Sequence, residues 1–228
     1  MRSDSGFPPA VREVLAVTAH PDDESFGIGS VLSALIAGGV RASVLCFTQG
    51  ESSTLGADCP DLTMLRRTEL SAAAGALGID DITQLTHPDG RLAEMTMDEL
   101  VGDVLQAAES VDALLVFDEG GVTGHPDHCR ATDAALAAAE VLDIPVLAWA
   151  IPEPVAEQLN AEFRTNFVGR EDSDLDFVIE VDRTRQLKAI ACHGSQSVEN
   201  PVLWRRLRLM GNGEWLRWLR PAHGSHEP

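Results

Sequence analysis

The stretch EVLAVTAHPDDE, residues 13–24, runs from a continuous apolar segment directly into one histidine and three carboxylates. An apolar run without polar alternation is typical of a strand that is covered on both faces of a parallel sheet. Ligands of such a sheet bind beyond the carboxyl ends of its strands. The stretch therefore predicts a buried parallel strand and a functional site at the end of that strand.

The rest of the chain alternates short apolar runs with Ala/Leu-rich helical patterns. The expected strands cover residues 13–19, 42–48, 82–85, 113–118, 146–151 and 177–181. The expected helices cover residues 26–37, 62–77, 96–108, 126–142 and 183–192. Because this alternation implies right-handed βαβ units, we expect a Rossmann-like, doubly wound α/β fold with a mostly parallel sheet and helices on both faces. We expect residues 1–220 to form a single catalytic domain and residues 221–228 to form a disordered tail.

The charge balance excludes some classes of partner. The chain of 228 residues has 36 acidic and 17 basic side chains, a formal net charge of −19. Nucleic acids and anionic membrane surfaces are bound by clustered Lys and Arg, so neither is an expected partner. The sequence has no signal-peptide pattern and no apolar run near the roughly 20 residues that a bilayer helix needs. Its four cysteines form no CxxC pair, and we expect a cytoplasmic protein.

A second polar cluster follows the fourth expected strand. The run ALLVFDE, residues 113–119, leads through a Gly-rich loop to His125-Pro126-Asp127-His128 at the start of a helix. The first and fourth strands commonly flank the crevice in this fold class. His125 and His128 are three residues apart, so they share a helix face. One carboxylate at such a turn is explained by helix capping, but two facing clusters of histidines and carboxylates favour a functional site.

Combined, the two clusters predict a metal site. We assign His20, Asp23 and His128 as its ligands, because two histidines and a carboxylate leave one position for water, as in a catalytic zinc site. The expected cofactor is therefore one Zn(II) per chain, with Fe(II) as the alternative because it accepts the same ligand set.

The remaining polar residues of the clusters suggest catalytic roles. Asp22, beside the assigned ligand Asp23, is placed to take a proton from water. His125 is placed to donate to a developing oxyanion, with Asp127 as its orienting partner. Spacing alone leaves open which carboxylate has which role.

The chain resembles the LmbE-like or PIG-L-type zinc-dependent N-deacetylases, which remove acetyl from N-acetylglucosamine-type amino sugars. The resemblance lies in AHPDDE at residues 19–24, HPDH at 125–128, the RxxE of 66–69, PDG at 88–90 and KAIACHGSQ at 188–196. It implies that His20, Asp23 and His128 bind zinc, that Asp22 is the general base and that His125 assists the oxyanion.

The resemblance also places Arg66 and Asp89 where family members contact substrate hydroxyls. Each residue has a simpler interpretation. Arg66 can pair with Glu69 along one helix surface, and Asp89-Gly90 is a good turn pair. Both interpretations remain open for both residues.

Several features qualify the resemblance or lie outside it. The chain has no tyrosine, which disfavours branches of the family that use a phenol near the metal. His87 and His193 are further candidates for the pocket rim, with hydrogen-bonded or surface positions as the alternative. The segment WRRLRLMGNGEWLRWLRP, residues 204–221, is expected to pack on the sheet as an amphipathic segment, with a substrate lid or an oligomer face as alternatives.

The predicted function is therefore metal-dependent hydrolysis of the N-acetyl amide bond of a small amino-sugar conjugate, with Asp22 as general base. Two other functional classes find less support in the sequence. The chain shows neither a P-loop nor a cluster of cations that would bind a phosphate group, which disfavours a metal-dependent phosphoesterase. A non-catalytic ligand-binding module has no need of a base beside an open metal site. A homo-oligomer is compatible with the sequence.

Overall fold

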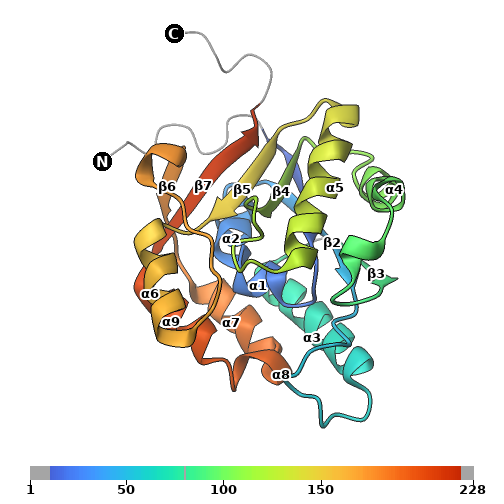
Figure 1. The fold of residues 1–228 in the computed structure, drawn as a ribbon. Helices are drawn as coiled ribbons and strands as arrows, with labels where there is room; N and C mark the ends of the chain where they lie inside the picture. Colours follow the sequence, from blue (N-terminus) through green and yellow to red (C-terminus); the bar gives the residue numbers. More distant parts are fainter. Residues whose placement is uncertain (1–10, 80, 222–228) are drawn as a thin grey trace.

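The sheet at the centre of the molecule has strand order β3-β2-β1-β4-β5-β7-β6 (Figure 1). It belongs to a computed structural model that describes residues 11–79 and 81–221. Within these residues its seven strands are β1 (Glu13–Thr18), β2 (Arg41–Thr48), β3 (Asp81–His87), β4 (Ala113–Phe117), β5 (Val146–Ala150), β6 (Phe177–Glu180) and β7 (Gly213–Arg220). The strands from β3 to β5 pair in parallel, and β7 pairs antiparallel with both β5 and β6. The predicted mostly parallel α/β fold is confirmed.

Helices cover both faces of the sheet. They are α1 (Asp23–Phe26), α2 (Gly29–Ala37), α3 (Leu62–Leu77), α4 (Met97–Ala107), α5 (Pro126–Leu142), α6 (Glu153–Phe163), α7 (Thr184–Cys192), α8 (Gly194–Ser197) and α9 (Pro201–Met210), with short 3-10 turns η1 (Leu92–Glu94) and η2 (Asp172–Asp174). None of the helices in the described residues has the length and apolar content needed to cross a bilayer.

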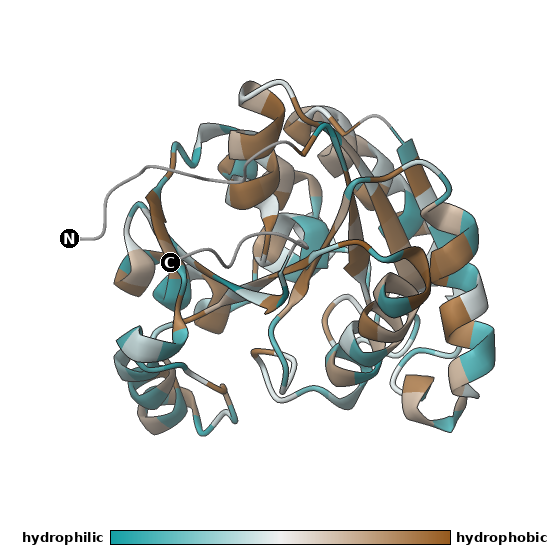
Figure 2. Cartoon of the chain, turned by 90° about the horizontal axis from the view of Figure 1, so that it is seen from above, coloured by the Kyte–Doolittle hydropathy of each residue, from teal (hydrophilic) through white to brown (hydrophobic). Residues whose placement is uncertain are grey.

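The uninterrupted apolar runs are explained by a core on each side of the sheet. On β1, Val14 and Ala16 face one core, which α2, α3, α6 and α9 cover. Leu15 and Val17 face the other core, beneath α4 and α5. Figure 2 shows the hydrophobic residues along the strands between the two helical layers. A strand buried on both faces needs apolar side chains at every position, which is why the runs do not alternate.

The first helical segment differs from the prediction. A continuous helix was expected over residues 26–37, but α1 begins at Asp23 and a break at Gly27 and Ile28 separates it from α2. A Cβ on Gly27 would lie 2.3 Å from the Phe117 ring. Because the backbone at Gly27 approaches β4 so closely, the chain turns there and sets Asp23 at the first position of a separate short helix.

The C-terminal region is the largest departure from the expected structure. Instead of lying on the sheet, residues after α9 form β7, which enters the sheet between β5 and β6. Its Glu214 is 1% exposed and forms an ion pair of 2.5 Å with Arg183, just before α7. Glu214 also accepts hydrogen bonds from Ser30 and Trp149. One buried carboxylate therefore joins β7, α7, α2 and β5.

That residues 1–220 form a single catalytic domain stays a prediction. Pro221 is the first residue of the expected tail, and residues 222–228 lie outside the described residues.

Removing the carboxylate of Glu214 should destabilise the fold strongly. Glu214→Ala leaves the guanidinium of Arg183 buried without its anion, and breaking a buried pair in this way typically removes about 3–5 kcal/mol from the free energy of unfolding. Urea denaturation of the purified variant measures this loss. As a control, Glu94→Ala removes the exposed pair with Arg91 and should change the unfolding free energy much less. Equal effects of the two substitutions would contradict the role of Glu214.

Candidate metal centre and active site

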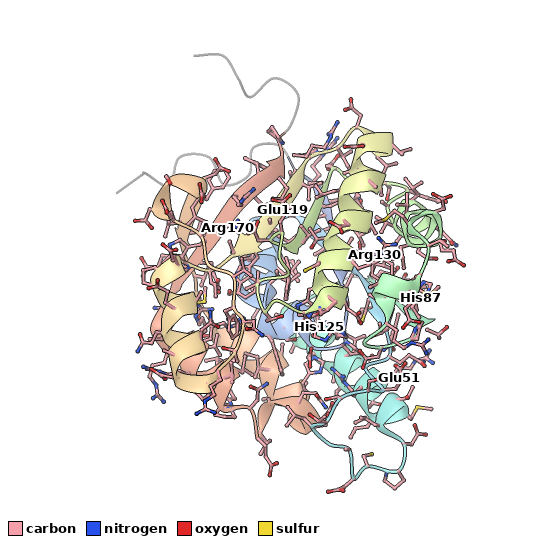
Figure 3. All side chains as sticks on the ribbon, in the orientation of Figure 1. Glu51, His87, Glu119, His125, Arg130 and Arg170 are labelled. Carbon is pink, nitrogen blue, oxygen red and sulfur yellow. The ribbon has the colours of Figure 1, made fainter. Side chains whose placement is uncertain are left out.

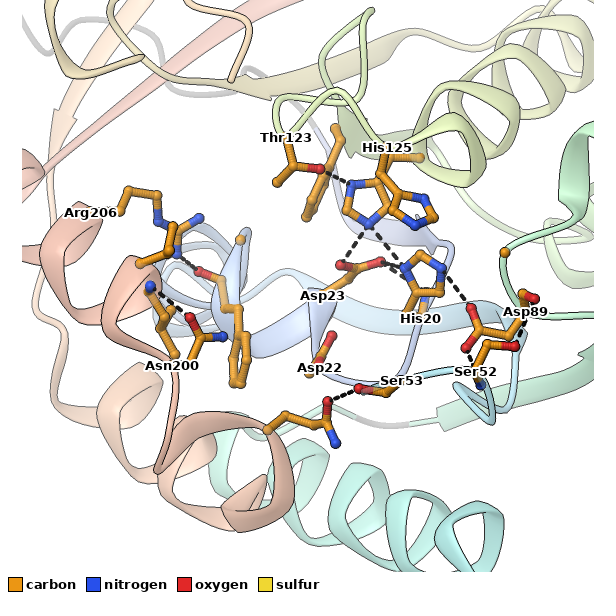
Figure 4. A pocket seen from close by; sticks show the side chains of 18 of the residues that line it. His20, Asp22, Asp23, Ser52, Ser53, Asp89, Thr123, His125, Asn200 and Arg206 are labelled. Carbon is orange, nitrogen blue, oxygen red and sulfur yellow. Dashed lines mark hydrogen bonds and ion pairs between the residues drawn. The ribbon is translucent and has the colours of Figure 1, made fainter. Parts of the chain in front are cut away.

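A cavity of about 420 Å³ opens at the carboxyl end of the sheet (Figure 4). The loops after β1, β2, β3 and β4 contribute to its wall, together with α9. This is the position that the sequence predicted for the site, because ligands of parallel sheets bind beyond the strand ends.

Asp23 is fixed in the wall of this cavity by the turn that follows β1. Its Oδ2 accepts hydrogen bonds from the backbone N–H groups of Ala19 (3.1 Å) and His20 (2.9 Å). Its Oδ1 lies 3.2 Å from Nε2 of His128. Burial by itself would raise the pKa of Asp23, but the imidazoles of His128 and His20 hold that pKa well below its usual value. The carboxylate is therefore ionised and aimed at the two histidines.

His128 directs its Nε2 to the other two candidate ligands and its Nδ1 to the loop that follows β4. Its Nδ1 lies 3.0 Å from the carbonyl oxygen of Gly121 and 3.0 Å from Oγ1 of Thr123. A carbonyl oxygen only accepts, so Nδ1 carries the proton and donates it. The neutral ring then has its lone pair on Nε2, which is the tautomer that a metal ligand requires.

His20 completes a set of three converging ligand atoms. Its Nε2 lies 3.1 Å from Oδ1 of Asp89 and 3.3 Å from Oδ2 of Asp127, so this nitrogen is the donor to carboxylates. Its Nδ1 lies 3.0 Å from Nε2 of His128 and 3.7 Å from Oδ2 of Asp23. Burial lowers the pKa of the imidazole, but the carboxylates of Asp127, Asp89 and Asp23 outweigh burial and raise it to about 10. The surroundings thus favour a positive charge here, as a proton or as a metal ion.

The geometry of this set fits a metal ion. Ligand atoms about 2.0 Å from a tetrahedral ion lie about 3.3 Å from each other. Nε2 of His128 lies 3.0 Å from Nδ1 of His20 and 3.2 Å from Oδ1 of Asp23, and the ligand atoms of the three residues all lie within 4.8 Å of one another. In the described part of the chain, a second group of His20, His125 and Asp127 also brings its ligand atoms within 4.8 Å. Both carboxylate oxygens of Asp127 accept from backbone N–H groups, whereas among the described residues only Oδ2 of Asp23 does, which leaves Oδ1 of Asp23 for a metal ion. The group of His20, Asp23 and His128 is therefore the better candidate ligand set.

Asp127 corrects one sequence prediction. Its fully buried carboxylate accepts hydrogen bonds from the backbone N–H groups of Gly90 (2.8 Å) and Leu92 (3.0 Å) and lies against His20. The side chain does not contact His125, whose Nδ1 instead accepts from the backbone N–H of Asp127 at 3.2 Å. The predicted orienting partner of His125 is therefore a positioning residue for His20.

His125 occupies the first position before α5 and lines the cavity. Because its Nδ1 accepts a hydrogen bond, the neutral ring carries its proton on Nε2 and can donate there. Burial, followed by the charges of His20 and His128, lowers the pKa of His125. The neutral form is favoured, which suits a hydrogen-bond donor to a developing negative charge.

Asp22 lies beside the ligand set in a strained backbone conformation. Its φ is 128°, a region that L-residues rarely adopt. Its N–H donates to Oε2 of Glu24 (2.9 Å), and its Oδ2 accepts from Nη2 of Arg66 (2.8 Å). Burial is the main reason that the pKa of Asp22 rises to about 6, against the opposing charge of Arg66. A carboxylate with such a pKa is suited to accept and return a proton near neutral pH.

Arg66 supports this turn from α3. Its Nη1 donates to the carbonyl of Gly50 (2.7 Å), and its Nη2 donates to Asp22 and to the carbonyl of Pro21. The alternative pairing with Glu69 is wrong, because that carboxylate accepts from the backbone N–H and hydroxyl of Ser195. Arg66 lines the cavity, and its contact with substrate stays a prediction.

Asp89 lies in the predicted turn and also lines the cavity, and its contact with a substrate hydroxyl stays a prediction. Gly90 has a φ of +78°, as a tight turn requires, and Asp89 lines the cavity as well. Its Oδ2 accepts from the N–H of Ser52 (2.8 Å). Burial would raise the pKa of Asp89, but its contact with His20 lowers the pKa overall. An ionised carboxylate is available to accept from a hydroxyl group.

Glu24 and His193 form a buried pair whose role sequence reasoning missed. Both side chains are fully buried, and His193 Nε2 lies 2.7 Å from Oε1 of Glu24. Since Oε2 of Glu24 accepts a hydrogen bond from the N–H of Asp22, the pair stabilises the strained turn. His193 was expected either at the rim or in a hydrogen-bonded position, and the second is observed. The last carboxylate of the AHPDDE motif and a late histidine were the available signals, but they are 169 residues apart in the sequence.

His87 does not line the cavity. Its Nε2 lies 2.6 Å from Oδ2 of Asp103 on α4, and Figure 3 shows it at the side of the molecule, away from His125. Other pocket residues that the sequence did not indicate include Ser52, Thr123 and Arg206. Ser52 and Thr123 lie in loops and Arg206 lies in α9, and none of the three belongs to a motif that indicates a site.

Comparison with known proteins shows the family to which the chain belongs. A family model described as PIG-L: GlcNAc-PI de-N-acetylase matches residues 15–139. The matched stretch is more than half of the chain and includes His20, Asp23 and His128. The chain belongs to the PIG-L family. The predicted resemblance is thereby confirmed.

Individual proteins of the family, and proteins that share the fold, have low sequence identity to this chain. A 1D-myo-inositol 2-acetamido-2-deoxy-alpha-D-glucopyranoside deacetylase of Catenulispora acidiphila is 30% identical over 168 residues, which cover 62% of this PIG-L family chain and 52% of that protein. The chain spans about half the length of such relatives, 52% and 44% in two of them. The zinc-inhibited form of a teicoplanin deacetylase has the same fold, with a TM-score of 0.67 and 19% identity over 93% of this chain and all of the other.

The fold also occurs outside deacetylases. A 4-carboxy-2-hydroxymuconate hydratase from Pseudomonas putida matches with a TM-score of 0.66 and 19% identity, over 95% of this chain and all of that one. The shared fold therefore leaves the reaction to be argued from the side chains of the site.

Crowding at Gly50 tests the arrangement around Arg66. Gly50 and Gly39 both have positive φ, +69° and +90°, so alanine is strained at either position. A Cβ at Gly50 would lie 2.0 Å from Nη1 of Arg66, whereas nothing lies within 4 Å of one at Gly39. Gly50→Ala should lower the unfolding free energy by about 2 kcal/mol more than Gly39→Ala, since it breaks charged hydrogen bonds. Equal losses in urea denaturation would contradict the packing of Arg66 against Gly50.

Proposed function

We propose that this chain is a metal-dependent hydrolase that removes the N-acetyl group from an N-acetylglucosamine-type amino-sugar conjugate. The observation that carries the proposal is the convergence of three ligand atoms, from His20, Asp23 and His128, beside the carboxylate of Asp22. Support also comes from the relatives, which are named as deacetylases of acetamido sugars.

The three converging side chains would hold one zinc ion, with Fe(II) as the other metal that suits them. When bound, the ion polarises the amide carbonyl and lowers the pKa of a water molecule. The remaining steps belong to the chain's own residues.

Asp22 is the proposed general base. Arg66 occupies its Oδ2, and Oδ1 has no hydrogen-bond partner among the described residues. Oδ1 is therefore the oxygen that accepts a proton from the water that attacks the acetyl carbon. The raised pKa of the carboxyl group lets it hold this proton until the leaving amine requires it.

His125 is the proposed donor to the acetyl oxygen. As the carbonyl carbon becomes tetrahedral, negative charge builds on that oxygen, and Nε2–H of a neutral His125 can stabilise it. The C–N bond then breaks as the nitrogen gains a proton. The two groups that can deliver this proton are Asp22, protonated in the first step, and His125.

Arg66 and Asp89 are proposed to contact the sugar. Asp89 presents an ionised carboxylate in the wall of the cavity, beside the ligand His20, where a substrate hydroxyl can donate to it. Arg66 is engaged by Asp22 and two carbonyls, so its main contribution is to hold the base in place.

The alternative of a phosphoesterase finds less support. The metal end of the cavity has several carboxylates and one arginine, Arg66, which is already paired. Phosphoryl transfer relies on several cations around the phosphate. The alternative of a non-catalytic module does not explain a base with a raised pKa beside the ligand set.

Metal removal should abolish acetate release. The purified protein should contain about one metal ion per chain, and treatment with dipicolinate should stop release of acetate from a panel of N-acetylglucosamine conjugates, with Zn(II), Co(II) or Fe(II) restoring it. The same preparation is tested on phosphomonoesters as a control. Full activity of metal-free protein, or phosphate release that exceeds acetate release, would refute the proposal.

Substitutions should separate metal binding from catalysis. His128→Ala leaves two protein ligands and should lose metal, with activity partly restored at high zinc. His125→Ala should keep its metal while kcat falls roughly 10²- to 10³-fold, as after loss of one oxyanion donor. Asp22→Asn is the matched control, because loss of the base also spares the metal and slows the chemical step. Metal analysis beside steady-state kinetics decides, and loss of metal from His125→Ala but not from His128→Ala would overturn the ligand assignment.

A further inference from the structure

The cavity has a second region, formed by α9 and the end of α1. Figure 4 shows Arg206 in this region, on the side away from Asp89. The apolar side chains that line the cavity are Phe26, Phe117, Phe167, Val202 and Leu203. The polar side chain of Asn200 also lies near Arg206 (Figure 4). A buried guanidinium group is an unusual element of a pocket, because burying a charge is unfavourable unless a partner compensates it.

Arg206 is a buried cation without a carboxylate partner in the described part of the chain. The buried arginines of that part are Arg66, Arg183 and Arg206. Arg66 is paired with Asp22 and Arg183 with Glu214. Arg206 forms no such ion pair among residues 11–79 and 81–221, and its Nε has no hydrogen-bond partner.

The guanidinium is nevertheless held in one orientation. It lies over the ring of the fully buried Trp149, with Cζ 4.9 Å from the ring centroid. Its Nη2 donates to the carbonyl of Phe26. A guanidinium has five N–H donors, so most of them lack an acceptor in this arrangement. Burial lowers the pKa of Arg206 to about 10, against the charge of Glu214, which acts without a direct ion pair, and the group still carries its charge at neutral pH.

We propose that Arg206 binds an acidic group on the aglycone of the substrate, so that the preferred substrate is an amino-sugar conjugate with one carboxylate or phosphate group. This inference rests on the proposed function, because the sugar must reach the metal end of the same cavity. The planar fork of an arginine forms two parallel hydrogen bonds to either oxyanion. The apolar wall strengthens these bonds because it excludes water.

The overall charge of the protein makes such a contact selective. A net charge of −19 repels anions in general, so an anion gains from this protein only at a specific cation. Arg206 lies in a different region of the pocket from the metal ligands, which suits recognition of a substituent rather than the reaction itself.

The test uses three N-acetylglucosamine conjugates of one phenyl aglycone, bearing a carboxylate, a phosphate or a neutral carboxamide. Two measurements are made on the metal-loaded protein, kcat/KM for acetate release and the dissociation constant by calorimetry. Wild type should prefer at least one acidic conjugate over the neutral one by about 10- to 100-fold, the range for hydrogen bonds to a charged group. The conjugate with the larger preference identifies the acidic group.

The variants assign this preference to Arg206. Arg206→Gln should abolish the preference, so that kcat/KM becomes similar for the acidic and neutral conjugates, mainly through a change in KM. Arg206→Lys should keep part of the preference, because the charge remains although the planar fork is lost. Arg205→Gln is the matched control. It changes the neighbouring arginine, which is paired with Glu162 and does not line the cavity, and it should leave the ratio unchanged.

The outcomes separate the two proposals. Acetate release without any preference for acidic conjugates in wild type overturns the role of Arg206 and leaves the deacetylase proposal intact, even where a variant fails to fold. Preferential binding of an acidic conjugate that depends on Arg206, without acetate release from any conjugate, supports the anion site and overturns the deacetylase proposal. An unchanged ratio in a folded Arg206→Gln variant also overturns the inference.

Discussion

Three electron-pair donors that point at one spot repel each other unless a cation lies among them. Nδ1 of His20, Nε2 of His128 and the carboxylate of Asp23 are held in this position by hydrogen bonds on their far sides. Asp127 and the backbone carbonyl of Gly121 fix the two rings, and backbone amides fix the carboxylate. The fold supplies these contacts from the ends of β1, β3 and β4, so the site depends on the sheet order that brings these strand ends together.

Much of this arrangement was predictable, because the deciding interactions are local in sequence. Residues 13–24 combine a doubly buried strand with the turn that carries the ligands, and HPDH at residues 125–128 begins a helix at the neighbouring strand end. Two local patterns and the geometry of parallel sheets therefore bring together residues more than 100 positions apart. The fold class and the proximity of the ligand atoms follow from these patterns without any knowledge of the loops.

The features that were missed depend on contacts that no local pattern records. Residues 213–220 have tryptophans and arginines in an order that suits an amphipathic segment, and only the buried partners of Glu214 show why they form a strand inside the sheet. The carboxylate of Asp127 turns to His20 because the amides of Gly90 and Leu92 meet it there. In both cases a buried polar group takes the partners that the distant chain offers, and this choice decides the local structure.

The position of β7 between β5 and β6 has a consequence for the order in which the molecule is built. During synthesis β6 and the helices α7 to α9 emerge before the strand that attaches β6 to the sheet. Strands β1 to β5, with the ligand set, are all made earlier and can associate first, since folding during translation starts from the N-terminal side. The part of the chain that carries His20, Asp23 and His128 is therefore made before β7 joins β6 to the sheet. The three converging side chains and the segment that carries Arg206 are thus separated in the order of synthesis as well as along the cavity.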